Sequence, residues 1–313
     1  MNFVVDRLRE SELAEAARIV RHAFGTFIGV PDLDTFWTDR DYVHGRWRAP
    51  HVAAFAARSD DRLVGSNFAV RWGSVGYFGP LTVDPAFQGQ GASHALLART
   101  MDAFDAWGTH QVGLFTFAHS AKHVGLYQKY GFHARFLTAV MATPAVRRPS
   151  NAAWTRFSAL APAEREEALR ACRDVAETLY PGLDLTDEIR TVTAEGLGDT
   201  VIVENAQGVA AFAIGHYGPR SEAGAGNCLI KFGAVRDTPT AGQDFLNLLD
   251  AAEALAADAG MPTLLVGMNL ARIEAYRQLV ARGFRTAIQG VAMHRGNEPG
   301  YCRPGIYVID DWR

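Results

Sequence analysis

The first half of the chain alternates between helical and strand-like hydrophobic patterns. Apolar residues recur at helical spacing over residues 11–24 and again over residues 93–107. Between these segments lie apolar runs that predict strands, and the polar sequence Ser59-Asp60-Asp61 separates two of them as a hairpin turn. The pattern predicts the order helix, antiparallel strands, helix, strand, helix, strand. The expected helices are 11–24, 93–107 and 120–130, and the expected strands are 51–58, 63–71, 75–83, 111–118 and 132–141.

The second half repeats this pattern at a fixed distance. Moving the sequence by 152 residues places Val83 on Val235 and Gly131 on Gly283, with no gap between them. The offset holds across a helix, a strand, a second helix and a second strand, and it is about half the chain length. We therefore predict two tandem copies of one α/β domain with a mixed sheet, in residues 1–145 and 153–313. A linker is expected between Pro144 and Ala153, containing Arg147, Arg148, Pro149 and Ser150.

Composition agrees with two ordinary globular domains. The chain has 313 residues, of which 48% are hydrophobic and 21% charged, so disorder and coiled coil are excluded for the chain as a whole. Lys and Arg number 31 against 34 Asp and Glu. A protein that binds nucleic acid mainly through phosphates would carry a basic surplus, so we expect no nucleic-acid partner.

The cysteines and the hydropathy of the chain indicate the cellular compartment that we expect. Cys172, Cys228 and Cys302 are far apart and odd in number, which predicts reduced thiols rather than a disulfide framework or a metal site. The N-terminus lacks the apolar stretch of a signal peptide. No window approaches the ~18 apolar residues of a membrane span. We therefore expect a soluble cytoplasmic protein without a metal or a membrane partner.

The most informative stretch is the glycine-rich sequence 88–93, between a predicted strand and a predicted helix. Gly89 and Gly91 allow a tight turn and the close approach of an anion, which the N–H groups of the turn and the helix N-terminus would bind. The missing Gly-Lys-Ser/Thr ending excludes a P-loop, and the missing third glycine argues against a dinucleotide fingerprint. On this pattern alone, a simple glycine-rich turn is the better interpretation.

The stretch Gln88-Gly89-Gln90-Gly91-Ala92-Ser93 resembles the signature of the GNAT acyltransferase superfamily. That signature, Gln/Arg-x-x-Gly-x-Gly/Ala, binds the pyrophosphate of acyl-CoA, and Ser93 is a mild departure in its last position. The preceding Leu81-Thr82-Val83 looks like the family's fourth strand, whose backbone edge pairs with the pantetheine arm. The resemblance covers about residues 1–142, and the second half is similar to the same fold more weakly.

A second stretch, from Ser120 to Phe132, resembles the family pattern Asn-x-x-Ala-x-x-Leu-Tyr-x-x-x-Gly-Phe. In that family the Tyr points at the thioester sulfur, and Tyr127 matches it. Ser120 stands in the Asn position and His123 in the Ala position. The resemblance implies that the acyl-CoA contacts are made by Leu81, Val83, Gln88, Gly89, Gln90, Gly91, Ala92, Ser93 and Ser120.

These resemblances imply an N-acetyltransferase that moves an acetyl (acyl) group from acetyl-CoA to an amine of a small molecule or peptide. Tyr127 is then the general acid that protonates the leaving thiolate, and the Val83 N–H stabilises the oxyanion. The alternative is a non-catalytic acyl-CoA-binding sensor module. Tyr127 separates the two, because a sensor needs no acid for a leaving group.

Several polar side chains near these motifs have two interpretations. His119 supplies a base or holds a relay water, or it is simply a capping or hydrogen-bonded histidine. His44 and His123 are interpreted as structural, and Tyr130 as a packing residue. Lys122 and Lys129 meet the 3′-phosphate of CoA or are solvated, as most helix lysines are.

The acceptor is not identified by the sequence. Residues 36–42 are unusually aromatic, and Trp47 and Trp72 add to them. These rings form either an aromatic-lined acceptor site or part of an ordinary core. Asn67, in an apolar strand, either binds the acceptor or satisfies a local backbone group.

The second copy lacks the residues that carry the chemistry. The offset places Thr240 on Gln88, Gln243 on Gly91 and Leu279 on Tyr127. We predict a degenerate copy that retains its core, and one acyl-CoA per chain. Crowding by Gln243 and Phe245 and repulsion from Asp237 are the expected causes. The expected role of this copy is to cover one side of the acceptor cleft or to support the first domain.

Overall fold

The computed structural model describes residues 3–149 and 152–313. Ser150, part of the expected linker, lies outside the described residues. The first copy contains β1 (Val4–Arg7), α1 (Leu13–Ile28), α2 (His44–Arg48), β2 (Val52–Ser59), β3 (Arg62–Trp72), β4 (Val75–Phe78), β5 (Thr82–Val83), α3 (Ala92–Trp107), β6 (Gln111–Thr116), α4 (Ala121–Gln128) and β7 (Phe132–Pro144). The second contains β8 (Ala153–Arg156), α5 (Pro162–Leu179), α6 (Thr186–Ala194), β9 (Gly198–Asn205), β10 (Gly208–Gly218), β11 (Gly224–Val235), α7 (Ala241–Asp258), β12 (Thr263–Asn269), α8 (Ile273–Ala281), β13 (Arg285–Arg295) and β14 (Val308–Ile309).

The predicted helices of the first copy are present, and so are the predicted strands, with boundaries within four residues except at one place. The expected strand 75–83 is wrong as a single element, because it divides into β4 and β5 around Gly79 and Pro80. Proline has no N–H to donate to a neighbouring strand, so regular pairing stops there. The short elements β1 and α2 were not predicted.

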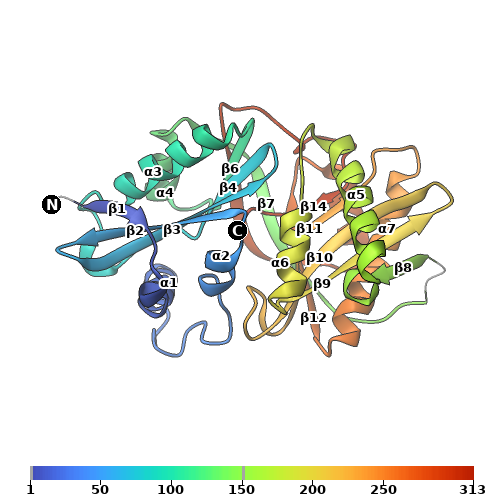
Figure 1. Ribbon diagram of the computed structural model, residues 1–313, viewed down its shortest axis with the longest axis horizontal. Helices are drawn as coiled ribbons and strands as arrows, with labels where there is room; N and C mark the ends of the chain where they lie inside the picture. Colours follow the sequence, from blue (N-terminus) through green and yellow to red (C-terminus); the bar gives the residue numbers. More distant parts are fainter. Residues whose placement is uncertain (1–2, 150–151) are drawn as a thin grey trace.

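Apolar residues on both faces of β2 explain why helices cover both sides of the sheet. Ala53 and Phe55 belong to a core with α3, whereas Ala54 and Ala56 pack with α1 on the opposite face. This follows from the alternation of side chains along a strand. In Figure 1, α3 and α4 lie above the strands of the first copy and α1 lies below them.

The strands of both copies form one continuous sheet in the order β1-β2-β3-β4-β6-β13-β7-β12-β11-β10-β9-β8. One long strand of each copy, β7 in the first and β13 in the second, pairs with a strand of the other copy. β13 pairs with β6, and β7 pairs with β12. Figure 1 shows the first copy on the left and the second on the right, with β7 between them.

The strand exchange is symmetric in register. Phe115 pairs with Ala292, and the residues 152 positions away, Gly267 and Val140, pair with each other. β7 and β13 also pair with each other, and Thr138 lies opposite Gly290. Those two positions differ by 152, so the local two-fold axis passes between them. Neither half completes a sheet of its own, and the division into residues 1–145 and 153–313 stays a prediction.

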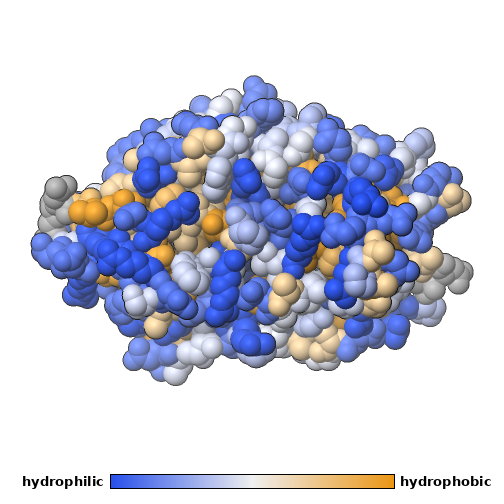
Figure 2. All heavy atoms as spheres, viewed as in Figure 1, coloured by the Kyte–Doolittle hydropathy of each residue, from blue (hydrophilic) through white to orange (hydrophobic). Residues whose placement is uncertain are grey.

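The surface and the interior have ordinary chemistry. The face in Figure 2 is mainly hydrophilic, with apolar side chains in small groups. Cys172, Cys228 and Cys302 are buried free thiols. Within residues 3–149 and 152–313, no helix is long and apolar enough to span a membrane. The same residues contain no group of three or more His, Cys, Asp or Glu side chains placed to hold a metal ion.

Candidate functional site

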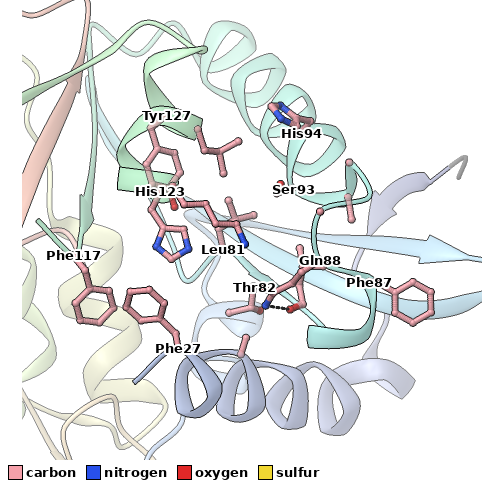
Figure 3. Close-up of a pocket in the computed structure, with 18 of the residues that line it drawn as sticks. Phe27, Leu81, Thr82, Phe87, Gln88, Ser93, His94, Phe117, His123 and Tyr127 are labelled. Atoms are coloured by element: carbon pink, nitrogen blue, oxygen red, sulfur yellow. Dashed lines mark hydrogen bonds between the residues drawn. The ribbon is translucent and has the colours of Figure 1, made fainter. Parts of the chain in front are cut away.

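A cavity of about 540 Å³ lies between α1, β5, the N-terminal end of α3, and α4. It exists because β4 and β6 pair only over a short stretch, from Val75 with Gln111 to Tyr77 with Gly113. Beyond that point β5 pairs only with β3, so its other edge is open. Figure 3 shows side chains from α1, β5, α3 and α4 around this space.

The glycine-rich loop presents a row of unpaired backbone donors. Within the described part of the chain, the five N–H groups from Gly89 to Ser93 have no hydrogen-bond partner, and Gly91 caps α3 without a side-chain bond. Gly89 and Gly91 have φ values of 77° and 101°, which L side chains rarely adopt. A Cβ on either residue would project into open space. These donors at a helix N-terminus fit a phosphate group.

The open edge of β5 presents two more donors. The Asp84 N–H donates to the Val64 carbonyl (2.8 Å), and Val83 lies opposite Gly65. Because N–H directions alternate along an antiparallel pair, the N–H groups of Leu81 and Val83 point away from β3. Both residues line the cavity. Backbone donors and acceptors on this edge can therefore pair with an extended ligand.

Tyr127 projects from α4 into the same cavity (Figure 3). It is 8% exposed, and its ring packs against that of Phe78 at 5.7 Å between centroids. Burial raises the pKa of the Tyr127 phenol well above its ordinary value, so the proton stays on Oη near neutral pH. Its hydroxyl forms no hydrogen bond with the described residues, which leaves the proton available to a ligand.

Gly125, in the middle of α4, was missed in the sequence. A glycine inside a helix costs about 1 kcal/mol relative to alanine, and this one lines the cavity. A Cβ at Gly125 would meet no atom within 4 Å. The residue therefore keeps the helix surface low where it faces the cavity, and a mid-helix glycine was the available signal.

The structure brings most of the predicted site residues together. Gln90 and Ser120 are not among the residues that line the cavity. Gln90 Nε2 donates to the Ala86 carbonyl, and Ser120 caps α4 by accepting from the His123 N–H. Gln88 lines the cavity, but its side-chain amide donates to the Val83 carbonyl at 3.3 Å (Figure 3). The predicted residues that line the cavity are Leu81, Val83, Gln88, Gly89, Gly91, Ala92, Ser93 and Tyr127.

A second cavity, of about 520 Å³, continues from the first. The two share six residues, so they meet beside the Tyr127 ring. Trp37 and Tyr42 from the aromatic segment line the second cavity, whereas Trp47 and Trp72 do not. The shared residues are Phe24, Phe27, Leu81, Phe117, His123 and Tyr127.

Residues 17–132 match the family model of the acetyltransferase (GNAT) family. This segment, a little over a third of the chain, is similar to the GNAT family. The match supports an N-acetyltransferase activity in general and leaves the acceptor open. Among curated proteins, none matches the chain significantly.

Solved structures extend the GNAT fold to both copies. A GCN5-related N-acetyltransferase from Sphaerobacter thermophilus is similar with a TM-score of 0.61 and 15% identity, over 97% of each chain. A tandem GNAT protein from the clavulanic acid biosynthesis pathway gives 0.57 and 13%, over 94% of this chain and 98% of the other. A GCN5-related N-acetyltransferase from Anabaena variabilis gives 0.55 and 13%, over 94% and 72%. The likeness shows a tandem GNAT fold.

His123 was interpreted as structural, yet it lines both cavities. Its Nδ1 lies 3.0 Å from Ser120 Oγ, and Figure 3 shows the imidazole between Tyr127 and Phe27. Burial, and then the charges of Lys122 and His119, lower the pKa of His123. The ring is therefore neutral at pH 7 and can accept a proton. A lone histidine in a helix gave no sequence signal for this position.

The other polar residues that had two interpretations in the sequence occupy different positions relative to the cavities. His119 lines the second cavity, and Lys122 and Lys129 line the first. Tyr130 donates to the His94 carbonyl at 2.9 Å and so joins α4 to α3. Asn67 is fully buried and donates to Thr100 Oγ1 at 2.8 Å, so it ties β3 to α3 and lines neither cavity.

The equivalent groove of the second copy is filled by the chain itself. β14 pairs antiparallel with β11 at Gly233 and Ala234, and the Val235 N–H donates to the Tyr307 carbonyl (3.1 Å). Val235 is the counterpart of Val83. Gln243 and Asp237 are exposed, and the crowding and repulsion expected from them stay predictions. Phe245 is buried and packs against Tyr307, at 5.4 Å between ring centroids.

Proposed function

We propose that the protein is an N-acetyltransferase that transfers an acetyl (acyl) group from acetyl-CoA to an amine of a small molecule or peptide, at the first copy. One observation carries the proposal. The unpaired N–H groups of residues 89–93, the open β5 edge and the Tyr127 hydroxyl all meet in one cavity, which opens into a second cavity suited to an acceptor.

The chain's own groups fit the parts of acyl-CoA. The N–H groups from Gly89 to Ser93 would hold the pyrophosphate, and the β5 edge would pair with the pantetheine amides. When bound, acyl-CoA supplies an activated acyl group as a thioester. Residues Leu81 and Val83 offer N–H donors where negative charge develops on the carbonyl oxygen.

Two side chains are placed to transfer the protons of the reaction. The reaction forms an amide C–N bond and breaks the thioester C–S bond, so a proton must leave the amine and another must reach sulfur. Tyr127 Oη holds a proton that it can give to the sulfur. Neutral His123, which faces the junction of the two cavities, can accept the proton from the amine.

The test is a thiol-release assay with acetyl-CoA and a panel of amines, beside a calorimetric titration with CoA. Turnover that depends on both substrates supports the proposal. Tight CoA binding without turnover for any amine, and with no effect of Tyr127→Phe, would instead favour a non-catalytic acyl-CoA sensor.

A further inference from the structure

The second cavity is built by both copies. The first copy contributes α1, the aromatic segment and the residues around Gly79. The second contributes Ile288, through the exchanged strand β13, and Trp312 and Arg313, from the segment after β14. Most of its wall is apolar or aromatic, with the rings of Phe24, Phe27, Trp37, Tyr42, Phe78, Phe117 and Trp312.

The charged side chains that line this cavity are both cationic. They are Arg40 and Arg313, and no Asp or Glu is among the described residues of the wall. An amine with a pKa of about 10 arrives mainly as an ammonium ion at pH 7. Two guanidinium groups repel a simple cation and attract an anion, so the wall suits an acceptor that carries an anionic group.

The two arginines retain donors for a ligand. Arg313 Nε lies 2.8 Å from Asp311 Oδ2, but its Nη2 is buried without a hydrogen-bond partner in the described part of the chain. Arg40 Nε contacts Asp39 Oδ1 at 3.3 Å, and its Nη atoms form no hydrogen bond with described residues. Arg313 Nη1 also forms no hydrogen bond with described residues and, unlike Nη2, is not fully buried. Nη1 of Arg313 and the Nη atoms of Arg40 are therefore the donors that a bound anion would reach.

Arg46, a nearby arginine with a structural role, uses its hydrogen-bond donors differently. It binds both carboxylate oxygens of Glu222, at 2.7 and 2.9 Å, and donates to the carbonyls of Gly79 and Arg313. Its donors are all directed at the protein, and Arg46 does not line the cavity. Arg40 and Arg313, in contrast to Arg46, line the cavity and keep Nη atoms that form no hydrogen bond with described residues.

We propose that the acceptor is an amine that also carries a carboxylate or phosphate group on an apolar or aromatic body. This rests on the proposed function of the first copy. Arg40 and Arg313 line only the second cavity, whereas Tyr127 and His123 lie where it meets the first. The anion therefore binds at the arginines, the body packs against the rings, and the amine reaches Tyr127 and His123. Guanidinium groups match planar carboxylates and phosphates through paired hydrogen bonds.

The experiment compares acceptors that differ only in charge. The first set is 4-(aminomethyl)benzoate, its neutral benzamide and the corresponding phosphonate. The second is L-phenylalanine and L-phenylalaninamide, which place the acid closer to the amine. For each, kcat/KM is measured by thiol release, and Kd by calorimetry with the protein saturated with CoA.

We expect an acid to be preferred over its amide by about 10- to 100-fold in at least one set, as for hydrogen bonds to charged groups. Arg40→Gln and Arg313→Gln should each remove most of that preference by lowering kcat/KM for the acid, while leaving the CoA Kd unchanged. Arg313→Lys keeps the charge and should retain part of the preference. Arg99→Gln, on the exposed side of α3, is the matched control and should change nothing.

The outcomes separate the two proposals. Equal binding of acids and amides, or a preference that survives both Gln variants, overturns the inference. Stronger binding of the phosphonate than of the carboxylate supports it and identifies a phosphoryl group as the anion. Arginine-dependent binding of the acids without thiol release for any amine also supports the anion site, and contradicts the proposed transferase function instead.

Discussion

The two copies share a fold and differ in what fills one edge of a strand. In the first copy the Val83 N–H points into an open cavity, whereas its counterpart Val235 donates to the Tyr307 carbonyl. β14 occupies the edge of β11 where the first copy leaves the edge of β5 free. The fold alone therefore does not open this groove. In the first copy the strand edge and the helix N-terminus are left unpaired, and these are the donors that we propose for acyl-CoA.

The difference also shows how the second copy pairs the backbone groups of this strand edge. Buried N–H groups without a partner are rare in proteins. Residues 307–309 satisfy those of β11, and the same segment continues to Trp312 and Arg313 in the second cavity of the first copy. The segment covers a strand edge in the second copy and lines a cavity of the first.

The largest effect is expected when Gly91 of the first copy is replaced by the Gln that the second copy carries at the equivalent position 243. Gly91→Gln should abolish CoA binding, because a side chain there fills the phosphate space and disturbs a φ of 101°. Loss of two or more charge-assisted hydrogen bonds, at about 1.5–3 kcal/mol each, lowers affinity on the order of 10²–10⁴-fold. Calorimetry should show a stoichiometry that falls from near one to near zero.

The matched change in the second copy is Gln243→Gly, at an exposed position. It should leave the stoichiometry near one, because β14 still covers the strand edge. A second CoA bound after this change, or a site that survives Gly91→Gln, would show that the second copy is a working acyl-CoA domain.

The catalytic difference is tested at Tyr127, whose counterpart is Leu279. Tyr127→Phe removes the proton donor, and kcat should fall on the order of 10²–10⁴-fold while the CoA Kd stays the same. Tyr276→Phe, in the second copy, should leave kcat unchanged. Full activity of Tyr127→Phe would remove the residue from the mechanism, and weaker CoA binding with normal turnover would make it a ligand contact.

Glu222 of the second copy tests how far contacts between the copies stabilise the first. Burial alone would raise the pKa of its carboxyl group, but Arg46 and Lys231 lower that pKa below its usual value. Glu222→Gln leaves the buried Arg46 without its anion and Lys231 with Glu188 alone, at 3.5 Å. The free energy of unfolding should therefore fall by about 3–5 kcal/mol. Urea denaturation measures this. Glu195→Gln, in an exposed pair with Arg48, should change stability by less than about 0.5 kcal/mol.

Periodicity and the repeat predicted much of the fold, because both depend on residues close together in the chain. The helices follow from apolar spacing, and the gapless offset from Val83 to Met141 marks corresponding elements. The strand exchange could not be predicted. β7 and β13 have apolar patterns that fit either half of the sheet, and the choice of partner depends on contacts between residues 152 positions apart.

The candidate site likewise contains some residues that could be predicted from the sequence and others that could not. Gly89, Gly91 and Tyr127 lie in local motifs and could be found in the sequence. Arg313 reaches the second cavity only through the path of the C-terminal segment, and no neighbouring residue indicates this. His123 replaces a small residue of the family pattern, and its place between two cavities depends on how α4 packs against α1.

The smallest expected effect concerns His123, which has no histidine counterpart in the second copy, where Ala275 is buried. Its pKa in the folded protein is below the usual value of about 6.5. The neutral, proton-accepting form therefore persists as the pH falls through 6.5, and the acid limb of kcat/KM should lie below that pH.

The effect of His123 on stability has the opposite sign to that of a histidine in an ion pair. The unfolded chain binds the proton more readily, so this residue's contribution to stability is present above pH 6.5 and is lost as the pH falls below it.

The test is the variant His123→Gln. It should remove the acid limb of kcat/KM and lower its plateau by about 10²-fold, whereas His44→Gln should alter neither. An acid limb that is unchanged in His123→Gln would assign the base to another group, and His119, in the same cavity, would be the next to test.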